Sequence, residues 1–427
     1  MAVRARNQSW YEDTANSRPS RPALDGEIDV DVAVIGGGFT GLSAALHLAG
    51  RGLGIAVIEA KRIGYGASGR NGGQLHTGQR RDQDWLEGKL GAANARRLWE
   101  VAEDAKLLVK DLINQHRIRC DWRGGLIHAV HKKRLVDDEK RGMEKLARDY
   151  GYHDLEWLNR AELADALGTD VYHGGVRDKG AGHLHPLNFA LGLAEAAERG
   201  GVKIHEGTPA VAISKGKRVT IKTPRGRISA ATVVIAGNGY LAGLEDEIEA
   251  HVMPINNFVL TTNPIGAGMR DGILAGGEAA ADSRFVVYYW RPTPDGRLLF
   301  GGGENYSHAF PSDIAGFVRK HMLRVYPQLD RAAISHAWGG TLGVTMTRMP
   351  YLRRIGGNIY TATGFSGQGV AMAPYAGKAV AEAILGETKG AFDLLSSVPA
   401  QRFPGGKLLR YPTLVAAMSW FALRDRI

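Results

Sequence analysis

The sequence of 427 residues is short of cysteine, since Cys120 is its only one. A single thiol cannot form an internal disulfide, and it cannot build a thiolate cage for a metal ion. Low cysteine content is typical of the reducing cytoplasm, where we expect the protein, although one cysteine is also compatible with the periplasm.

Long apolar runs are also missing. No stretch of 18 apolar residues occurs, so the sequence predicts no membrane-spanning helix. Residues 1–27 are polar, contain Pro19 and Pro22, and lack the apolar run of a signal peptide, so we interpret them as an N-terminal arm. The apolar segment Leu414–Leu423 is flanked by arginines. We interpret it as docking on its own domain or on a second subunit of a homo-oligomer, with contact to a membrane surface as the less favoured alternative.

Charge of one sign is not gathered into a block. Lysine and arginine number 54 against 44 aspartate and glutamate, a net charge of +10 spread along the chain. This surplus could favour an anionic partner, but no nucleic-acid-binding module accompanies it, so we expect no nucleic acid as a partner. His183 and His185 share one face of a strand without a third suitably spaced ligand, so we expect no metal site.

Glycine, by contrast, is abundant: 57 of 427 residues, about 13%, against a typical share of about 7%. The glycines cluster without a fixed period, which indicates tight turns and backbone lying close to a ligand. Elsewhere, hydrophobic periodicity predicts charged amphipathic helices over 81–115 and 133–168, a helix over 187–199, and strands over 202–205, 219–223, 228–235, 258–262, 285–290, 298–301 and 359–362.

The first glycine cluster lies between a predicted strand, Val30–Ile35, and a predicted helix, Leu42–Ala49. Gly36 allows a tight turn, Gly38 lets a pyrophosphate approach the backbone, and Gly41 lets the helix pack close to the strand. The amide groups at the start of this helix would face the phosphates. The pattern therefore predicts a dinucleotide-binding β-α-β unit.

A second strand, Ile55–Ile58, ends at Glu59, 23 residues after Gly36. A carboxylate there can accept hydrogen bonds from both ribose hydroxyls and repels a 2′-phosphate, which disfavours NADP. A further small-residue loop follows over 61–73, and glycines recur after the strands that end near 236 and 363. Four glycine-rich contacts spread over this length favour long, buried FAD over a diffusible nicotinamide.

These motifs, DVAVIGGGFTGLSAALHLA, GYGASGRNGGQ, GHLHPLNFALGLAEAA, VVIAGNGY, TGFSGQGVAMAPYAGKAVAEAI and PTLVAAMSWFALRDRI, resemble the FAD-dependent amine and amino-acid oxidases of the D-amino-acid-oxidase type. Within that group the pattern is most similar to the gamma-glutamylputrescine oxidoreductases. The resemblance implies an α/β plus α+β fold in which a Rossmann-like FAD-binding domain is interleaved with an antiparallel-sheet substrate domain. The expected parts are an FAD-binding domain of residues 28–112, 175–244 and 342–395, a substrate domain of 113–174 and 245–341, and a C-terminal extension, 396–427.

The resemblance also implies which residues bind FAD. The first part of the set comprises Gly36, Gly37, Gly38, Phe39, Thr40, Gly41, Glu59, Ala60, Arg62, Ser68, Gly69, Arg70, Asn71, Gly72 and Gly73. Ala210 or Val211 would meet the adenine through the backbone, and Gly237 would lie by the pyrophosphate. The last part, which would cover the flavin N1/O2 edge, comprises Gly364, Phe365, Ser366, Gly367, Gln368 and Gly369. The helix that starts there points its positive end at the part of the ring that becomes anionic on reduction.

By the same resemblance, the flavin takes a hydride from the carbon beside an amine nitrogen, the imine is hydrolysed, and O2 reoxidises the flavin to give H2O2. Related sarcosine oxidases attach FAD to a cysteine within the stretch that reads Ala337–Thr341 here, so we expect noncovalent FAD. They also place a carboxylate-binding lysine where this chain has Ala371. That departure favours a small-molecule amine, such as a gamma-glutamylated polyamine, over a simple α-amino acid.

Candidate catalytic residues are aromatic or cationic. Tyr289, Trp290 and Trp338 could form a desolvated wall that lowers the pKa of the amine, whose deprotonation at neutral pH costs roughly 4 kcal/mol. His76, just after the glycine loop, could point into the pocket. Arg291, like Arg348 elsewhere in the chain, could hold a distal carboxylate or assist oxygen reduction. Two alternatives stay open: an oxidase or dehydrogenase of sarcosine, glycine, D-amino acids or proline, and a noncatalytic electron-transfer flavoprotein subunit.

Overall fold

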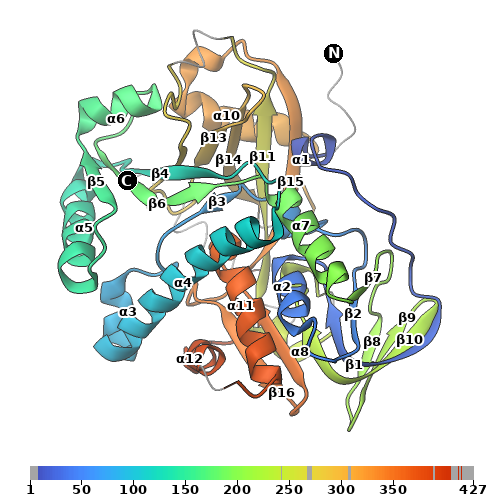
Figure 1. Ribbon diagram of the computed structural model, residues 1–427. Helices are drawn as coiled ribbons and strands as arrows, with labels where there is room; N and C mark the ends of the chain where they lie inside the picture. The colour runs from blue at the N-terminus through green and yellow to red at the C-terminus, as the bar shows by residue number, and fades with distance from the viewer. Residues whose placement is uncertain are drawn as a thin grey trace.

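The computed structural model describes residues 8–241, 243–266, 272–305, 309–387 and 390–404, together with 412 and 415, except for the side chains of residues 304 and 305. It contains two large sheets surrounded by helices (Figure 1). The C-terminal segment predicted to dock on the protein lies outside the described residues, apart from the exposed Val415. The expected combination of an α/β part and a largely antiparallel sheet is confirmed.

The first sheet has eight strands and a parallel centre. Its main path runs in the order β16 (Tyr351–Ile355), β17 (Ile359–Thr363), β10 (Gly226–Ile235), β1 (Gly26–Ile35), β2 (Ile55–Ile58) and β7 (Lys203–His205). The short strands β8 (Ala212–Ser214) and β9 (Val219–Thr223) extend from β10. All four residues of β2 are buried, as expected for a parallel strand covered on both faces.

Helices from three distant parts of the chain pack around this sheet. They are α2 (Phe39–Leu48), α4 (Ala92–His116), α7 (Pro186–Arg199) and α11 (Gly369–Ile384). Helices α2 and α11 lie against each other (Figure 1). Their contact is close, because a Cβ on Gly377 would lie 2.3 Å from the carbonyl oxygen of Thr40. This contact sets the positions of both helices relative to the sheet.

The second sheet has nine strands and is antiparallel except where β12 pairs with β4. Its order is β15 (Ile334–Val344), β11 (Met253–Thr262), β14 (Leu298–Asn305), β13 (Tyr289–Pro292), β12 (Ala279–Asp282), β4 (Arg123–Ala129), β6 (Gly175–His183) and β3 (Gln74–Leu75), with β5 (Leu155–Leu158) paired to β6. Helix α10 (Ile314–Val325) packs on β11, β14 and β15. The aromatic core between them includes Trp290, Phe300 and Tyr326.

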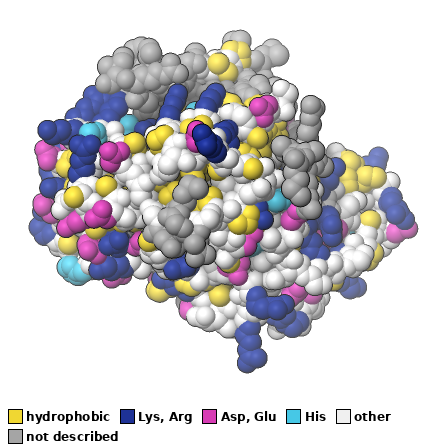
Figure 2. Space-filling model, turned by 90° about the horizontal axis from the view of Figure 1, so that it is seen from above, with side chains coloured by type: hydrophobic (Ala, Val, Ile, Leu, Met, Phe, Trp, Pro, Cys, Tyr) yellow, Lys and Arg dark blue, Asp and Glu magenta, His cyan; other side chains and the backbone are white. Residues whose placement is uncertain are grey.

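The helices outside these layers are short or peripheral. They are α1 (Trp10–Asp13), α3 (Gln83–Leu90), α5 (Val136–Tyr150), α6 (Arg160–Leu167), α8 (Asp246–His251) and α12 (Ala391–Ser397). Lysine and arginine side chains are scattered among acidic ones over the face shown in Figure 2. This distribution agrees with a solvated basic surface.

The N-terminal arm is more deeply integrated than its polar composition indicates. Trp10 and Tyr11 on α1 are buried at 3% and 0% exposure. Asp13 pairs with His336 of β15 at 3.0 Å, and Arg21 donates two 2.7 Å hydrogen bonds to Glu198 on α7. The segment therefore joins elements that are distant in the chain.

The β-α-β unit predicted around the first glycine cluster is confirmed, with β2 at the predicted residues. The helices predicted over 133–168 are α5 and α6, and a short strand that was not predicted separates them. Gly151 adopts a left-handed conformation at φ 69°, which ends α5, and β5 and α6 follow. The strand predicted over 285–290 begins at Tyr289, four residues later.

Candidate active site

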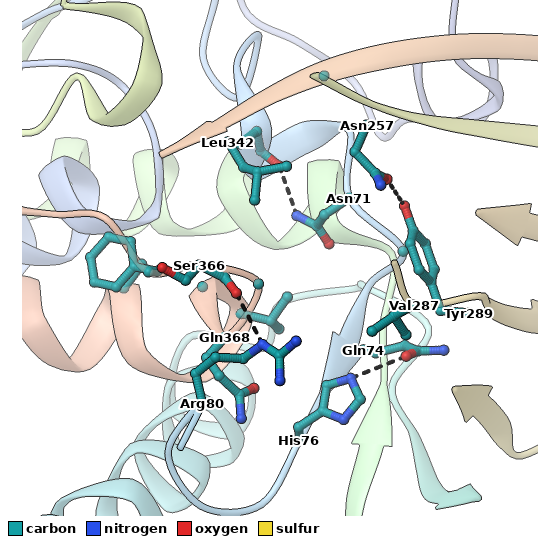
Figure 3. A pocket seen from close by; sticks show the side chains of 18 of the residues that line it. Asn71, Gln74, His76, Arg80, Asn257, Val287, Tyr289, Leu342, Ser366 and Gln368 are labelled. Carbon is teal, nitrogen blue, oxygen red and sulfur yellow. Dashed lines mark hydrogen bonds between the residues drawn. The ribbon is translucent and has the colours of Figure 1, made fainter. Parts of the chain in front are cut away.

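A cavity of about 490 Å³ lies between the two sheets and is lined by residues from both (Figure 3). Its walls come from the start of α2, the loop around residues 67–76, the connection between β12 and β13, the end of β15, and the start of α11. Its volume is in the usual range for small-molecule and cofactor sites.

The glycine turn after β1 lies at one wall. Gly36 has φ +114°, and a Cβ on Gly41 would lie 2.0 Å from the carbonyl oxygen of Gly36. Gly38, Phe39 and Thr40 line the cavity, and α2 starts there with no side-chain cap. An uncapped helix N-terminus with its amides facing a cavity is the arrangement that binds phosphate groups, so the turn fits a dinucleotide.

Glu59 stands beside this turn, at the end of β2. Its carboxylate accepts hydrogen bonds from the amides of Gly37 at 2.8 Å and Lys61 at 2.9 Å. Burial raises the pKa of Glu59, and these two amides oppose that rise. The carboxylate is therefore held in place next to the glycine turn, where a ribose would lie.

The loop that follows β2 forms the next wall. Ser68 Oγ accepts a 3.0 Å hydrogen bond from the amide of Phe39, which joins the loop to the start of α2. Arg70 donates to the carbonyl of Tyr65 at 2.9 Å and lies 3.7 Å from Glu12. Asn71 Oδ1 accepts from the amide of Gly73 at 2.7 Å. Ser68, Arg70, Asn71 and Gly72 all line the cavity.

A second uncapped helix N-terminus, that of α11, faces the same cavity. Phe365–Gly369 line it, and Gln368 at the N-cap makes no capping hydrogen bond. Asn238 Oδ1 fixes the turn by accepting hydrogen bonds from the amide of Gly364 and from Thr363 Oγ1, both at 3.0 Å. The positive end of this helix suits the negative charge that a flavin ring acquires on reduction.

The opposite wall carries neutral polar groups. Tyr289 donates a 2.6 Å hydrogen bond to Asn257 Oδ1. Gln74 Nε2 donates to the carbonyl of Ala280 at 2.8 Å, so its Oε1, 3.1 Å from His76 Nε2, is an acceptor (Figure 3). This network assigns the proton to Nε2 of His76 and leaves Nδ1 as an acceptor. Burial, with positive charge at His128 and Arg80, lowers the pKa of His76 to about 3, so the ring is neutral at physiological pH.

Of the five predicted catalytic residues, Tyr289 and His76 line the cavity, and the other three do not. Trp290 points into the aromatic core, stacked on Phe300 at 5.8 Å. Arg291 is buried behind the wall, where Nε donates to the carbonyl of Gly72 at 2.9 Å. Trp338 Nε1 donates to the carbonyl of Arg70 at 2.9 Å. These three side chains lie outside the cavity lining, and their contact with substrate remains a prediction.

Some predicted cofactor residues also lie outside the cavity lining. Val211 is 52% exposed, and its amide donates to the carbonyl of Lys222 at 2.8 Å. Residues predicted to contact FAD that are absent from the cavity wall are Gly36, Gly37, Gly41, Glu59, Ala60, Arg62, Gly69, Gly73, Ala210, Val211, Gly237 and Gly364. Their contacts with FAD remain predictions.

Several cavity residues were not among the predicted set. They are Gln74, Arg80, His128, Asn238, Asn257, Asp282, Arg284, Phe285 and Val287. Arg80 and Gln74 follow the glycine loop closely, so their position in the sequence was a usable signal. Asn238 follows β10, in a glycine-bearing turn that the sequence showed. The others come from strands of the second sheet or from the connection between β12 and β13, whose positions no local pattern shows.

Cys120 is buried and does not line the cavity, and burial raises the pKa of its thiol to about 12. Across the part of the chain that the structure describes, no three His, Cys, Asp or Glu side chains are grouped so that they could hold a metal ion. No described helix is both long enough and apolar enough to cross a membrane.

Comparisons with known proteins agree with this geometry. A family model described as "DAO: FAD dependent oxidoreductase" matches residues 31–383. The chain is 44% identical over 419 residues to the probable oxidoreductase OrdL of Rhizobium meliloti (strain 1021), covering 98% of this chain and 97% of that protein. It is 36% identical over 423 residues to gamma-glutamylputrescine oxidoreductase of Escherichia coli (strain K12), covering 98% of each.

Solved structures share the fold. Glycine oxidase from Geobacillus kaustophilus matches with a TM-score of 0.71 at 22% identity, over 86% of this chain and 97% of that one. L-proline dehydrogenase from P. horikoshii matches with a TM-score of 0.70 at 24% identity, over 87% of this chain and 96% of that one. The chain therefore belongs to the DAO family of FAD-dependent oxidoreductases.

Proposed function

We propose that the protein is an FAD-dependent amine oxidase that acts on a primary aliphatic amine of the gamma-glutamylputrescine type. FAD, when bound, would supply a hydride acceptor for the carbon that bears the amine, and water would convert the resulting imine to an aldehyde and ammonia. With O2 as the acceptor, the amine, O2 and water give the aldehyde, ammonia and H2O2. The relative from Escherichia coli, aligned over nearly the whole of both chains, supports this substrate class.

The observation that carries the proposal is the lack of a counter-ion for an ammonium group in the cavity wall. Among the described residues that line the cavity, Asp282 is the acidic one, and it forms an ion pair with Arg284. Tyr289, Asn257 and Gln74 on this wall are neutral, and the charges that act on His76, at His128 and Arg80, are positive. Such a wall lowers the pKa of a bound amine and favours the free amine, whose nitrogen lone pair assists hydride release. This environment offsets part of the roughly 4 kcal/mol that deprotonation costs in water.

The groups on this wall would also orient the amine. His76 Nδ1 can accept an N–H, because Nε2 carries the ring proton. Asn257 is held by the hydroxyl of Tyr289, and its amide nitrogen donates to the carbonyl of Gly303 at 3.3 Å. These groups are fixed by hydrogen bonds before substrate arrives, which reduces the entropy lost on binding.

The cavity gives weaker support to an α-amino acid as the substrate. The position at which related sarcosine oxidases have a carboxylate-binding lysine is occupied by Ala371, which is 4% exposed in α11. A carboxylate next to the reacting nitrogen would have no cation from that position. This departure is the reason for preferring an amine that lacks an α-carboxylate at the reacting end.

The test mixes the holoenzyme anaerobically with gamma-glutamylputrescine and follows the flavin absorbance. We expect bleaching, and H2O2 should form after air is admitted. Sarcosine, glycine, proline and D-alanine are tested in the same way. Rapid bleaching by one of these amino acids, with none by gamma-glutamylputrescine, would contradict the proposal and favour an amino-acid oxidase. No bleaching by any of them would favour a noncatalytic electron-transfer role.

A matched pair of variants tests the wall itself. Tyr289→Phe removes the hydroxyl that holds Asn257, and we expect kcat/KM for the amine to fall about tenfold. Tyr326→Phe removes another buried hydroxyl, which donates to the carbonyl of Leu167 at 2.7 Å but does not line the cavity. Its kcat/KM should remain near that of the wild type. Equal effects of the two changes would show that the Tyr289 effect is a loss of stability.

A further inference from the structure

Arg348 places an uncompensated positive charge in the cavity wall. It lies at the end of the turn that begins at Thr345, with its amide bonded to the Thr345 carbonyl at 3.1 Å, and its φ is +65°. The guanidinium lies over the ring of Phe285, 5.0 Å from the centroid. Among the residues that the structure describes, no carboxylate lies within ion-pair distance of it.

Two further arginines donate to backbone carbonyls here, Arg81 in the same turn and Arg80 in the turn before α11 that Thr345 contacts. Arg80, which lines the cavity, donates to the carbonyl of Ser366 at 3.3 Å (Figure 3). Arg81 donates to the carbonyl of Thr347, the residue before Arg348, at 2.8 Å. Burial and the nearby charge of Arg348 lower the pKa of Arg81. Positive charges are therefore brought together here, although each repels the others.

Two of the other three arginines in the cavity wall have an acidic partner. Four arginines and one aspartate line it. Arg70 has Glu12 at 3.7 Å, and Arg284 has the buried Asp282. No described acidic side chain balances Arg348 in this way. Arg348 is half-buried in this wall, and a bound anion would supply the partner that the described side chains do not.

The surroundings of Arg348 separate it from the phosphate-binding turn. The glycine turn and Ser68 form the wall at the start of α2. Arg348 instead contacts Phe285, in the connection between β12 and β13, and Val287 and Tyr289 follow in the same cavity wall. Phe285 and Val287 thus add apolar surface to the wall that Arg348 and Tyr289 share. A ligand that fits both the neutral polar groups and Arg348 is an aliphatic chain with an amine at one end and an anion at the other.

We propose that Arg348 binds a carboxylate at the end of the substrate distal to the reacting amine. This inference rests on the proposed function, and it restricts the substrates to aliphatic amines with a remote carboxylate. A guanidinium can engage a carboxylate through two parallel N–H···O bonds, which gives geometric selectivity as well as affinity.

The test measures binding to the oxidised holoenzyme and does not require turnover. N-butylglutaramate carries a carboxylate and no amine, and N-butylpentanamide is a neutral analogue of similar length. Each is titrated while the flavin absorbance or the heat of binding is recorded. Hydrogen bonds to charged groups contribute about 1.5–3 kcal/mol, so the carboxylate should bind about tenfold to a hundredfold more tightly. Equal Kd values for the two ligands would overturn the proposal, whether or not the enzyme oxidises amines.

Variants then identify the residue responsible. Arg348→Leu should abolish the preference for the carboxylate and leave the affinity for the neutral amide unchanged, whereas Arg348→Lys should retain part of it. Arg227→Leu is the control, because it removes an exposed arginine that pairs with Glu27 at 2.7 Å, far from the cavity lining. Retention of the full preference in Arg348→Leu would refute the assignment. Flavin content and the melting temperature show whether each variant is folded. If Arg348→Leu does not fold, the test uses Arg348→Lys instead.

Discussion

Replacing Gly72 by alanine tests how tightly the wall of the cavity is packed. A Cβ on Gly72 would lie 2.7 Å from Cδ2 and from Cε2 of Tyr289. The ring of Tyr289 cannot move away from Gly72, because its other side already packs against the backbone of Gly301. A Cβ on Gly301 would lie only 2.0 Å from Cζ of this ring. The hydroxyl of Tyr289 is tied to Asn257 at 2.6 Å. Gly72→Ala must therefore displace a ring that is held on three sides.

The expected magnitude follows from two contributions. Overpacking of a filled site costs about 1–3 kcal/mol, and loss of the hydrogen bond to Asn257 adds about 1 kcal/mol. Gly72→Ala should therefore destabilise the protein by about 2–4 kcal/mol. With an unfolding entropy of roughly 2.1 cal/mol/K per residue, the melting temperature of the holoenzyme should fall by about 2–4 °C.

The assay is thermal unfolding at saturating FAD, in which Gly72→Ala is compared with two further variants. Gly88→Ala, in α3, adds a Cβ with no atom within 4 Å, so it should leave stability unchanged or raise it by about 0.5–1 kcal/mol. Tyr289→Ala removes the ring, so adding Gly72→Ala to it should cost less than about 0.5 kcal/mol. The reasoning fails if Gly72→Ala costs as much without the Tyr289 ring as with it.

Three further predictions concern buried groups. Burial, with the charge of Arg291, lowers the pKa of His185 to about 3, and Nδ1 of this histidine accepts a hydrogen bond from the amide of Asn188 at 3.1 Å. Below pH 6.5 the unfolded chain therefore binds more protons than the folded protein. The free energy of unfolding should fall as the pH drops from 6.5 towards 3. His185→Asn preserves the cap and should reduce that slope by up to about 1.4 kcal/mol per pH unit, measured by melting at each pH. Cys120 should react with a thiol reagent only after the protein unfolds, because its thiol is buried. Acid precipitation should release all of the flavin into the supernatant, and a coloured precipitate would contradict noncovalent binding of FAD. Tyr11→Phe removes the acceptor of a 3.2 Å hydrogen bond from Arg291 and should lower the free energy of unfolding by about 1–2 kcal/mol without changing KM, as urea titration and steady-state kinetics can check.

Local patterns in the sequence were sufficient for the parallel sheet and the dinucleotide turn. The strand Ile55–Ile58 is observed as predicted, and the helix after Gly36 begins three residues before the predicted start, at Phe39. These elements follow from short-range causes: an apolar run, a glycine turn and an amphipathic helix. A dinucleotide site depends on such a local unit, so its prediction needed no knowledge of the rest of the fold.

The substrate wall could not be predicted in the same way. Three aromatic residues follow one another at 288–290, and composition alone does not show which of them faces the ligand. The structure alternates them: Tyr288 and Trp290 lie in the aromatic core, and Tyr289 lines the cavity. Arg348 likewise lines the cavity from a turn that a hydrogen bond between Thr345 and Ser366, 21 residues apart, joins to the segment before α11. These orientations depend on strand register and on contacts between distant segments.

The docking of α1 has a consequence for biosynthesis. Asp13 pairs with His336, which lies 323 residues later, and Tyr11 packs on Trp338. At about 5–20 residues per second, a ribosome needs roughly 16–65 s to make the second partner after the first. The contacts of α1 with α7, such as Tyr11 on His185, can form earlier. Its contacts with β15 can form only after that strand has been synthesised.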